Sequence, residues 1–373
     1  MKSLDTNKLT YQIALTLIQG IGNVTAKTLL SYCGSIQNIF EAAPKQLLKI
    51  PSIGQKTVQL LAKKEEALLR ATKEVEFIQK NDITPLFFTD TTYPLRLRNC
   101  TDSPILLYQK GTVNLNPSHV ISIVGTRKGT DYGRKICENL IESFAAYDVL
   151  IVSGLAYGID YQSHKACVQQ AVPTEGVLAH GLDRIYPFQH TRLAQQMTQN
   201  GGLLSEFVSE IEMHPRHFPM RNRLIAGMAD ATLVIETAKK GGSIITANIA
   251  RNYNRDVFAF PGSIHAPYSV GCNDLIKKNI ATLVQSPEEI IEALGWGKAG
   301  EKPKSVQKTL LLNLSKEEEI VITLFKKMPN QSLSKLEIKQ QTKLSSNQLF
   351  EILLNLELNG LLKKMPGNKF KLE

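Results

Sequence analysis

Arginines and small residues flank a short apolar segment of the sequence, residues 231–236. The run Arg-Asn-Arg at 221–223 precedes this segment, and Gly-Gly-Ser at 241–243 follows it and opens a helical pattern over 244–250. In an open α/β sheet, ligands bind outside the carboxyl ends of the strands, where helix N-termini present free N–H groups. The arrangement therefore indicates an anionic ligand, with phosphate as the first choice. A structural turn with a solvated arginine pair is an equally weighted alternative.

A second small-residue turn follows the apolar run 120–124. It reads Gly-Thr-Arg at 125–127, and glycine lets backbone N–H groups approach an anion while an arginine can bind phosphate through two hydrogen bonds. Ser153 and Gly154 follow the apolar run 149–152 in the same way. The G-x-G-x-x-G fingerprint and the G-x-x-x-x-G-K-[ST] loop are both missing, so neither a dinucleotide nor ATP hydrolysis is indicated.

The segment 214–223 is the most DNA-like part of the sequence. It combines three arginines and two histidines with Phe218. Proteins hold single strands without reading their sequence by combining a basic groove with aromatic rings on which bases stack. Phe218 is therefore a candidate for base stacking, and the alternative is that it anchors a loop as a buried side chain.

Candidates for catalysis are few. Asp160 and His164 are four residues apart and could pair on one helix face, but the favoured interpretation is a helix-start aspartate with a histidine packed against the sheet. Glu206 could hold a sugar hydroxyl, catalyse hydrolysis or cap a loop. The sequence has no G-x-S-x-G elbow, no H-E-x-x-H and no clustered Cys/His spacing. We expect no catalytic residue, no metal and no cofactor.

The elements that position these residues alternate between apolar runs and helical patterns. Such alternation is typical of a Rossmann-like α/β domain, a doubly wound parallel sheet with right-handed crossovers. Its predicted limits are residues 81–295. The predicted strands are 120–124, 149–152, 174–179, 202–207, 231–236, 256–260 and 281–284, and the predicted helices include 132–146, 164–170, 244–250 and 287–294.

Residues 1–80 are predicted to form a helical domain. Two similar breaks, Ile21-Gly22 and Ile53-Gly54, each precede an amphipathic helix and resemble a tandem of helix-hairpin-helix (SAM-like) motifs. Such hairpins can hold a DNA phosphate through the N–H groups of the second helix. They also serve purely in packing, which is the favoured interpretation here.

The last part of the chain has its own pattern. Residues 296–310 are rich in glycine and lysine and predict a linker. Residues 311–373 predict three helices and a β-hairpin, which together make a winged-helix domain. Its third predicted helix, 346–358, contains no lysine or arginine, so a docking or dimerisation role is favoured over DNA binding.

Composition narrows the class of partner and the compartment. The 373 residues carry a formal net charge of +10, which favours a polyanion as partner. Five scattered cysteines form no C-x-x-C pair and indicate a reducing compartment. No secretory signal and no apolar run of the ~20 residues that span a bilayer are evident. We expect a cytoplasmic protein without a membrane anchor.

These motifs together resemble the DNA-processing protein A (DprA/Smf) family, strongly over residues 83–294. The resemblance implies a non-enzymatic protein that binds and protects incoming single-stranded DNA during natural transformation, loads the RecA recombinase onto it and forms a homodimer. The runs that carry the resemblance are, in order, VISIVGTR, IVSGLAYGID, HGLDRIYP, GGLLSEF, FPMRNRLIAGMADATLVIETAKKGGSIITANIA and VFAFPG with GCNDLI.

The resemblance also implies which residues bind the single strand. Gly241 stands where the family has a serine, which puts one hydroxyl contact in question, and Thr174-Glu175-Gly176 replaces a more apolar strand start, with an expected effect on packing only. The implied site residues are Gly125, Thr126, Arg127, Ser153, Gly154, Phe218, Arg221, Asn222, Arg223, Gly242, Ser243 and Thr246.

Two other function classes fit parts of the sequence. A nucleotide-processing hydrolase, similar to phosphoribohydrolases, would use Glu206, but such enzymes carry a P-G-G-x-G-T loop that Lys240-Gly241-Gly242-Ser243 does not match. An interaction scaffold would use the winged helix for a partner and the sheet for dimerisation alone. It predicts that Arg127→Ala leaves DNA affinity unchanged.

Overall fold

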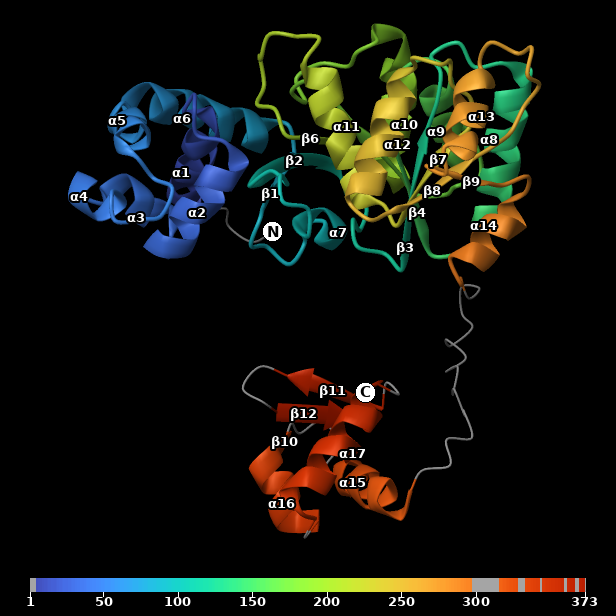
Figure 1. The fold of residues 1–373 in the computed structure, drawn as a ribbon. Helices are drawn as coiled ribbons and strands as arrows, with labels where there is room; N and C mark the ends of the chain where they lie inside the picture. The colour runs from blue at the N-terminus through green and yellow to red at the C-terminus, as the bar shows by residue number, and fades with distance from the viewer. Residues whose placement is uncertain are drawn as a thin grey trace. The chain divides into compact units, whose positions relative to one another are not determined.

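The computed structural model describes residues 5–296, 315–327, 333–342, 344–358, 361–365 and 369–372. The chain divides into two compact units, Met1–Glu301 (unit 1) and Lys302–Glu373 (unit 2) (Figure 1). From residue 297 on, the predicted linker 296–310 lies outside the described residues.

Unit 1 contains a nine-stranded sheet in the part of the chain that the structure describes. The order is β1-β2-β6-β5-β4-β3-β7-β8-β9. Neighbouring strands from β6 to β9 run parallel, and β1 and β2 add an antiparallel edge. Every predicted strand occurs. The bounds are β1 Thr84–Phe87, β2 Leu106–Gly111, β3 His119–Val124, β4 Val149–Ser153, β5 Thr174–Val177, β6 Gly202–Ser205, β7 Ala231–Val234, β8 Asp256–Ala259 and β9 Thr282–Leu283.

Helices cover both faces of this sheet (Figure 1). The four helices named above occur as α8, α9, α12 and α14, although α9 begins at Ile159 rather than His164. Four helices, α7, α10, α11 and α13, have no counterpart in the prediction. The helices of this region are α7 Leu95–Arg98, α8 Asp131–Phe144, α9 Ile159–Gln169, α10 Thr191–Asn200 after the 3₁₀ turn Phe188–His190, α11 His217–Met228, α12 Gly242–Asn252, α13 Val270–Lys277 and α14 Pro287–Ala293.

Alternate side chains of β3 enter two hydrophobic cores, one on each face of the sheet. Val120 and Val124 join the core that α11 and α12 cover, and Ile121 and Ile123 join the core that α8 and α9 cover. Burial on both faces explains why the parallel strands are continuous apolar runs. The strand order reverses at β3, because β4, β5 and β6 lie on one side of it in the sheet and β7, β8 and β9 lie on the other. Ligand sites of open α/β sheets lie at such a switch point.

The N-terminal helices of unit 1 pack on the sheet region through buried polar contacts. Glu74 of α6 is 2% exposed and accepts hydrogen bonds from Ser209 N (2.9 Å) and Ser209 Oγ (2.5 Å) in the loop after β6. Lys27 of α2 donates to Ser103 Oγ (2.6 Å) and lies over the Phe88 ring. The bounds are α1 Thr6–Leu17, α2 Asn23–Cys33, α3 Ile36–Glu41, α4 Pro44–Leu47, α5 Gln55–Ala62 and α6 Glu65–Lys80.

Unit 2 has three helices and a small sheet of order β10-β12-β11 in its described residues. Its core includes Val321, Phe325, Leu353, Leu356 and Phe370. The three helices and the hairpin were predicted, the short strand β10 was not, and assignment as a winged helix stays a prediction. The bounds are α15 Lys316–Lys327, β10 Leu333–Ser334, α16 Lys335–Thr342, α17 Ser346–Leu358, β11 Leu362–Met365 and β12 Lys369–Leu372.

Candidate nucleic-acid interface

A crevice of about 520 Å³ opens at the carboxyl edge of the sheet. Its walls are the turn after β3, the first turn of α11 and the first turn of α12, so it lies at the switch point between β3 and β7. Most of the predicted site residues come together here. Those that line the crevice are Gly125, Thr126, Arg127, Phe218, Arg221, Asn222, Gly242, Ser243 and Thr246.

The turn after β3 is held by backbone hydrogen bonds to its neighbours. Thr126 N donates to Glu236 O (2.6 Å), and Ile159 N donates to Thr126 O (3.1 Å). Gly158 has a φ of +76°, and a Cβ there would lie 2.1 Å from Thr126 O. The close approach of the two loops therefore requires glycine at 158.

Glu236, two residues after β7, fixes the start of α8 beside the crevice. Its carboxylate accepts hydrogen bonds from Thr130 N (2.9 Å) and Thr130 Oγ1 (2.7 Å). Both carboxylate oxygens are thus engaged by the N-cap residue of α8. The Glu236 carboxylate therefore has a structural role and does not pair with the basic side chains of the crevice.

Arg127 and Phe218 lie face to face at the crevice. The guanidinium carbon of Arg127 is 5.6 Å from the centre of the Phe218 ring. Arg127 is exposed, and within the described ranges it has no hydrogen-bond or ion-pair partner. A free guanidinium beside a half-buried ring offers a charge to a phosphate and an aromatic face to a base.

The N-terminus of α12 faces the same space. Its N-cap, Gly241, provides no side-chain cap, so the first N–H groups of the helix and the positive end of its dipole remain available to an anion. Ser243 is buried, and its Oγ has no hydrogen-bond partner among the described residues. A Cβ at Gly241 would lie 2.1 Å from Thr237 Oγ1. Thr237 therefore occupies the room that the family's serine would need.

Arg221 lines the crevice as a buried cross-link. It is 5% exposed, and its Nη1 donates to Gly154 O (2.5 Å) and to Val177 O. These carbonyl groups follow β4 and end β5, so one guanidinium ties two strands together. Burial lowers the pKa of Arg221 to about 10, and the nearby Asp160 carboxylate opposes this shift. The side chain stays charged near neutral pH.

Two predicted site residues, Arg223 and Ser153, do not line the crevice. Arg223 forms an ion pair with Glu206 and donates to Asp102 O (2.6 Å). Ser153 is fully buried, and its Oγ donates to Ile123 O (2.6 Å) inside the sheet. Gly154 lines a smaller neighbouring pocket instead of the crevice.

The candidate catalytic groups have structural partners. His164 is fully buried and its Nδ1 lies 2.7 Å from Thr174 Oγ1 on the sheet, as the packing interpretation predicted. Burial lowers the pKa of His164 to about 3, so the ring is neutral at physiological pH. Asp160 accepts from Ala156 N (3.3 Å). Glu206 pairs with Arg223 and is absent from the crevice lining.

A smaller pocket of about 70 Å³, the aromatic pocket, adjoins the crevice. Its lining includes Tyr157, His180 and Tyr186, which the sequence analysis did not single out. The sequence did contain a signal for these lining residues. The motif HGLDRIYP directly follows the predicted strand 174–179, as the other site motifs directly follow their predicted strands. The full lining is Arg127, Gly154, Ala156, Tyr157, Leu178, Ala179, His180, Tyr186, Pro187, Phe218 and Arg221.

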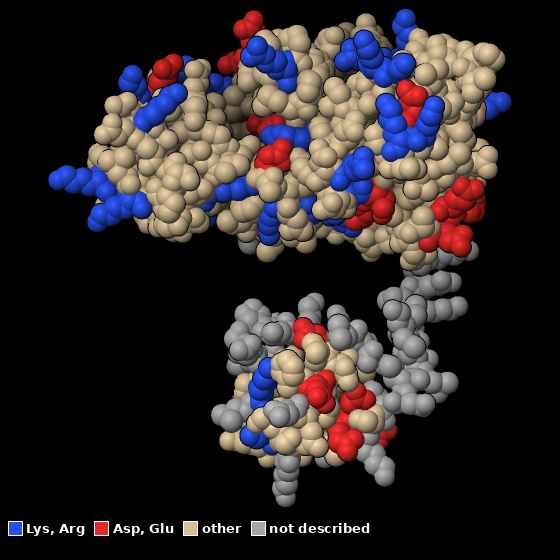
Figure 2. All heavy atoms as spheres, viewed as in Figure 1, with Lys and Arg blue, Asp and Glu red and all other residues tan. Residues whose placement is uncertain are grey.

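Basic side chains also lie well outside the crevice. Figure 2 shows groups of Lys and Arg along the upper rim of unit 1 and around its N-terminal helices. Exposed Lys128 follows Arg127, and exposed Lys239 and Lys240 precede α12. Within the described ranges, no three His, Cys, Asp or Glu side chains gather as a metal site would require. No helix in the same ranges is long and apolar enough to cross a membrane.

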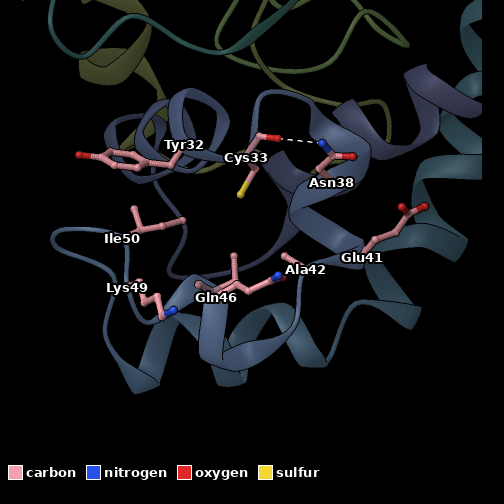
Figure 3. A pocket seen from close by; sticks show the side chains of 9 residues that line it. Tyr32, Cys33, Asn38, Glu41, Ala42, Gln46, Lys49 and Ile50 are labelled. Atoms are coloured by element: carbon pink, nitrogen blue, oxygen red, sulfur yellow. Dashed lines mark hydrogen bonds between the residues drawn. The ribbon is translucent and has the colours of Figure 1, made fainter.

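A separate cavity of about 500 Å³ lies among α2, α3 and α4 (Figure 3). Cys33 and Ile50 line it together with the exposed side chains of Tyr32 and Lys49. Asn38 Nδ2 donates to Cys33 O (2.8 Å) at its rim. None of the predicted site residues lies there.

Two family models match the chain. One, described as DNA recombination-mediator protein A, matches residues 84–295, and the other, described as SAM-like helix-hairpin-helix tandem, matches residues 13–64. Protein Smf of Synechocystis sp. is 34% identical over 291 residues, which cover 76% of this chain and 72% of the relative. DNA processing protein DprA of Bacillus subtilis is 38% identical over 217 residues, which cover 58% of this chain and 73% of the relative.

Solved structures agree with the sequence matches. The X-ray structure of DNA processing protein A from Streptococcus pneumoniae aligns with a TM-score of 0.65 and 31% identity over 76% of this chain and 97% of its own. A Helicobacter pylori structure, described as showing the unique single-stranded DNA binding mode of DNA processing protein A, aligns with a TM-score of 0.52 and 27% identity over 57% of this chain and 95% of its own. The chain belongs to the DNA recombination-mediator protein A family, whose curated members are named DNA processing protein DprA or Smf.

Proposed function

We propose that this protein binds single-stranded DNA in the crevice and acts as a non-enzymatic recombination mediator. The observation that carries the proposal is Arg127, whose guanidinium has no hydrogen-bond or ion-pair partner among the described residues and lies 5.6 Å from the centre of the Phe218 ring. The uncapped start of α12 lines the same crevice. Two positive elements and an aromatic ring in one crevice suit a phosphate backbone with its bases.

The aromatic ring favours a single strand over a duplex. A base can stack on Phe218 only when it has left its own stack, as bases in single strands readily do. Sequence-independent binding follows, because phosphates carry no sequence information and every base has a π-face. The relative from Helicobacter pylori, whose structure is described by its single-stranded DNA binding mode, supports this choice.

The candidate acids and bases argue against the hydrolase alternative. Glu206 is held by Arg223, and His164 bonds to Thr174 inside the fold, so neither faces the crevice. Asp160 does line the crevice, where its carboxylate accepts a hydrogen bond from Ala156 N. Release of free base from a nucleoside monophosphate, abolished by Glu206→Gln, would establish the hydrolase and overturn the proposal.

Fluorescence anisotropy with a labelled oligo-dT strand and a duplex of equal length, over a salt series, tests the proposal. We expect the single strand to bind more tightly and Arg127→Ala to weaken binding about tenfold, which is ~1.4 kcal/mol. The slope of log affinity against log salt should fall by about one unit. The matched control is Arg134→Ala, because Arg134 is exposed on α8, outside the crevice, and pairs with Asp131 (2.9 Å). Equal losses in both variants would show that only net charge matters.

The finer role belongs to the same proposal. We propose that the protein protects incoming single-stranded DNA in natural transformation, passes it to RecA and works as a homodimer. The measurement is the rate of RecA filament formation on single-stranded DNA with and without the protein, alongside the molar mass in solution. No acceleration of RecA would remove the loading role, and the mass of one chain would remove the dimer, while DNA binding would stand.

A further inference from the structure

A short loop between α7 and β2, residues 101–103, is bonded by side chains from three helices. Lys27 reaches it from α2, Arg223 from α11, and Tyr253 from the carboxyl end of α12. The first of these helices belongs to the N-terminal region, whereas the other two begin at the crevice. Loop 101–103 therefore connects the N-terminal helices with two walls of the proposed DNA site.

On its N-terminal side the loop is fixed by α2. Lys27 Nζ donates to Ser103 Oγ (2.6 Å) and to Thr101 O (3.3 Å), and Ser103 is fully buried. Asn23, in the first turn of α2, accepts a hydrogen bond from Ile105 N (3.2 Å) just beyond the loop. These bonds hold the loop along its whole length against one helix.

On the crevice side, α11 and α12 both bond to Asp102. Arg223 Nη1 donates to Asp102 O (2.6 Å), and Tyr253 OH donates to Asp102 Oδ1 (2.5 Å). The second arm of the Arg223 guanidinium pairs with Glu206, and the two side chains of this pair are 12% and 8% exposed. A planar guanidinium with two fixed partners allows little freedom of orientation. Asp102 thus defines where both helices lie.

The position of α11 decides which of its side chains reach the crevice. Successive residues of a helix point about 100° apart, so the direction of Arg223 also sets the directions of Arg221 and Asn222, which line the crevice. The first turn of α12 lines the same crevice, and Tyr253 holds the opposite end of that helix. Because α11 and α12 pack on each other, a displaced loop would move both walls.

We propose that Lys27, Asp102 and Arg223 are positioning residues of the DNA site, through which the N-terminal helices hold α11 and α12 in the arrangement that binds a single strand. The inference rests on the proposed single-strand binding and gives the N-terminal helices a part in it. None of these three side chains lines the crevice, so they act without touching the strand. Arg223 and Glu206, which the binding contacts leave unused, thereby acquire a role.

The test is the binding of labelled oligo-dT to the full chain by anisotropy over a salt series, with Lys27→Met. We expect affinity to fall about threefold to tenfold, a range typical of residues that influence a ligand they do not touch. The slope of log affinity against log salt should not change, because Lys27 neutralises no phosphate, whereas Arg127→Ala should lower it. Lys45→Met, at an exposed lysine of α4, removes the same charge and is the matched control.

A second variant shows whether the contacts act through one loop. Tyr253→Phe removes only the hydrogen bond to Asp102 and should lower affinity about twofold to threefold, again with an unchanged salt slope. The double variant with Lys27→Met should lose less than the product of the two single losses, because both substitutions release the same loop. Titration of the binding-competent fraction separates affinity from stability, since a purely structural role reduces that fraction and leaves its affinity unchanged.

Each outcome decides. Weaker binding at an unchanged salt slope in Lys27→Met, absent from Lys45→Met, supports the proposal. Wild-type affinity in the competent fraction of Lys27→Met overturns it, and so does a slope lowered by about one unit, because Lys27 would then contact a phosphate. If Lys27→Met does not fold, Tyr253→Phe decides by the same criteria. Failure of the wild type to bind oligo-dT would instead remove the proposed function itself.

Discussion

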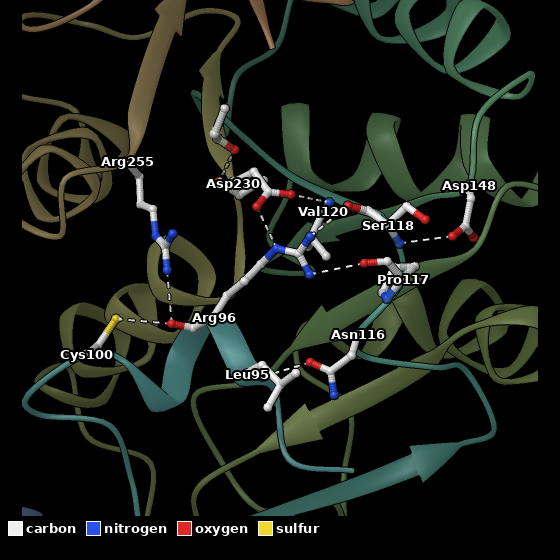
Figure 4. Close-up of polar contacts among 12 residues, drawn as sticks. Leu95, Arg96, Cys100, Asn116, Pro117, Ser118, Val120, Asp148, Asp230 and Arg255 are labelled. Carbon is white, nitrogen blue, oxygen red and sulfur yellow. Dashed lines mark hydrogen bonds and ion pairs between the residues drawn. The ribbon is translucent and has the colours of Figure 1, made fainter. Parts of the chain in front are cut away.

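The two edges of the same sheet use arginine in opposite ways. At the amino edge, Arg96 donates to Asp230 Oδ1 (2.6 Å) and to the carbonyl groups of Pro117 (3.2 Å) and Ser118 (2.9 Å) (Figure 4). At the carboxyl edge, Arg127 has neither a hydrogen-bond nor an ion-pair partner in the part of the chain that the structure describes. Arg96 is bonded within the fold, whereas Arg127 is the arginine that we propose to bind DNA.

The two edges present different backbone groups. At the amino edge, Arg96 binds carbonyl groups of the loop that leads into β3, whereas at the carboxyl edge helices begin and present N–H groups. At the amino edge, Asp230 also accepts from Val120 N (2.9 Å), and Asp148 accepts from Ser118 N (2.9 Å). These groups of the amino edge are therefore bonded within the protein, whereas the proposed anion site lies at the carboxyl edge.

Arg221 is an exception to this difference between the edges. It lies at the carboxyl edge, yet its guanidinium binds backbone carbonyl groups, as that of Arg96 does. It binds the carbonyl groups of Gly154 and Val177, and a Cβ at Gly154 would lie 2.8 Å from its guanidinium carbon. The fit leaves room for glycine only. Arg221 thus shapes the floor of the crevice, and its effect on DNA binding is expected to pass through the positions of β4 and β5.

The largest effect is expected for Arg221→Ala. Removal of this buried charge leaves two carbonyl groups without their donor and the buried Asp160 without a nearby positive charge, at a cost of about 3 kcal/mol in the free energy of unfolding. DNA affinity should fall as well. Arg221→Lys keeps the charge but cannot span two carbonyl groups, so it should resemble Arg221→Ala in urea denaturation and in anisotropy. Full recovery by lysine would show that Arg221 acts through its charge alone.

A smaller effect, confined to stability, is expected for Asp230→Ala at the amino edge. The variant loses hydrogen bonds from Arg96 and from Val120 N, and we expect the free energy of unfolding to fall by about 2 kcal/mol. Oligo-dT affinity should stay within twofold of the wild type. Arg127→Ala should do the reverse, changing the unfolding free energy by under about 0.5 kcal/mol, as exposed substitutions usually do. If both variants lost affinity alike, the two edges would not be functionally distinct.

Much of the sheet was predictable from the sequence, because strands buried on both faces must be apolar throughout. β3, β4 and β7 are recognisable in the sequence for this reason. The turns and helical patterns that follow them then showed which residues lie at the carboxyl edge of the sheet. Strand ends were less predictable, since Phe207 and Val208 are as apolar as β6 and yet belong to the following loop.

The directions of the two arginines in the run 221–223 could not be predicted from the sequence. No helix was predicted for this run, and Arg221 and Arg223 were both implied as residues of one site. The segment is helical from His217, and Pro219 is tolerated because the first turn of a helix needs no backbone donors. Residues two apart on a helix point to opposite sides. Arg223 consequently faces Glu206, and only Arg221 lines the crevice.

Glu175 is a third case, a buried carboxyl group at neither edge, and the Gln109 side chain opposes the rise that burial causes in its pKa. It is fully buried on β5, and neither carboxylate oxygen has a hydrogen-bond partner among the described residues. A Cβ at Gly202 would lie 2.5 Å from Glu175 Oε2, so the carboxyl group fills the space of a missing side chain. The expectation that this departure affects packing only stays a prediction, and burial also raises the pKa of the carboxyl group.

The smallest net effect is expected for Glu175→Gln, and it depends on pH. Burial raises the pKa of Glu175 well above its usual range, whereas the unfolded chain titrates near 4.3. As pH rises above ~4.3, the unfolded state loses this proton and the folded state keeps it, so wild-type stability falls by up to about 1.4 kcal/mol per pH unit until the folded pKa is reached. Glutamine has no such titration, although its buried amide offsets part of the gain.

Urea denaturation at several pH values would measure this difference. We expect Glu175→Gln to be about 1 kcal/mol more stable than the wild type at pH 7.5, and we expect that advantage to vanish near pH 4.5, where Glu175 is protonated in both states. Glu142→Gln, at an exposed position of α8, removes the same charge and should show no such trend. A constant gap across the pH range would mean that Glu175 is ionised in the folded protein. The middle of the sheet, like its carboxyl edge, would then hold a charge that the described chain leaves unpaired.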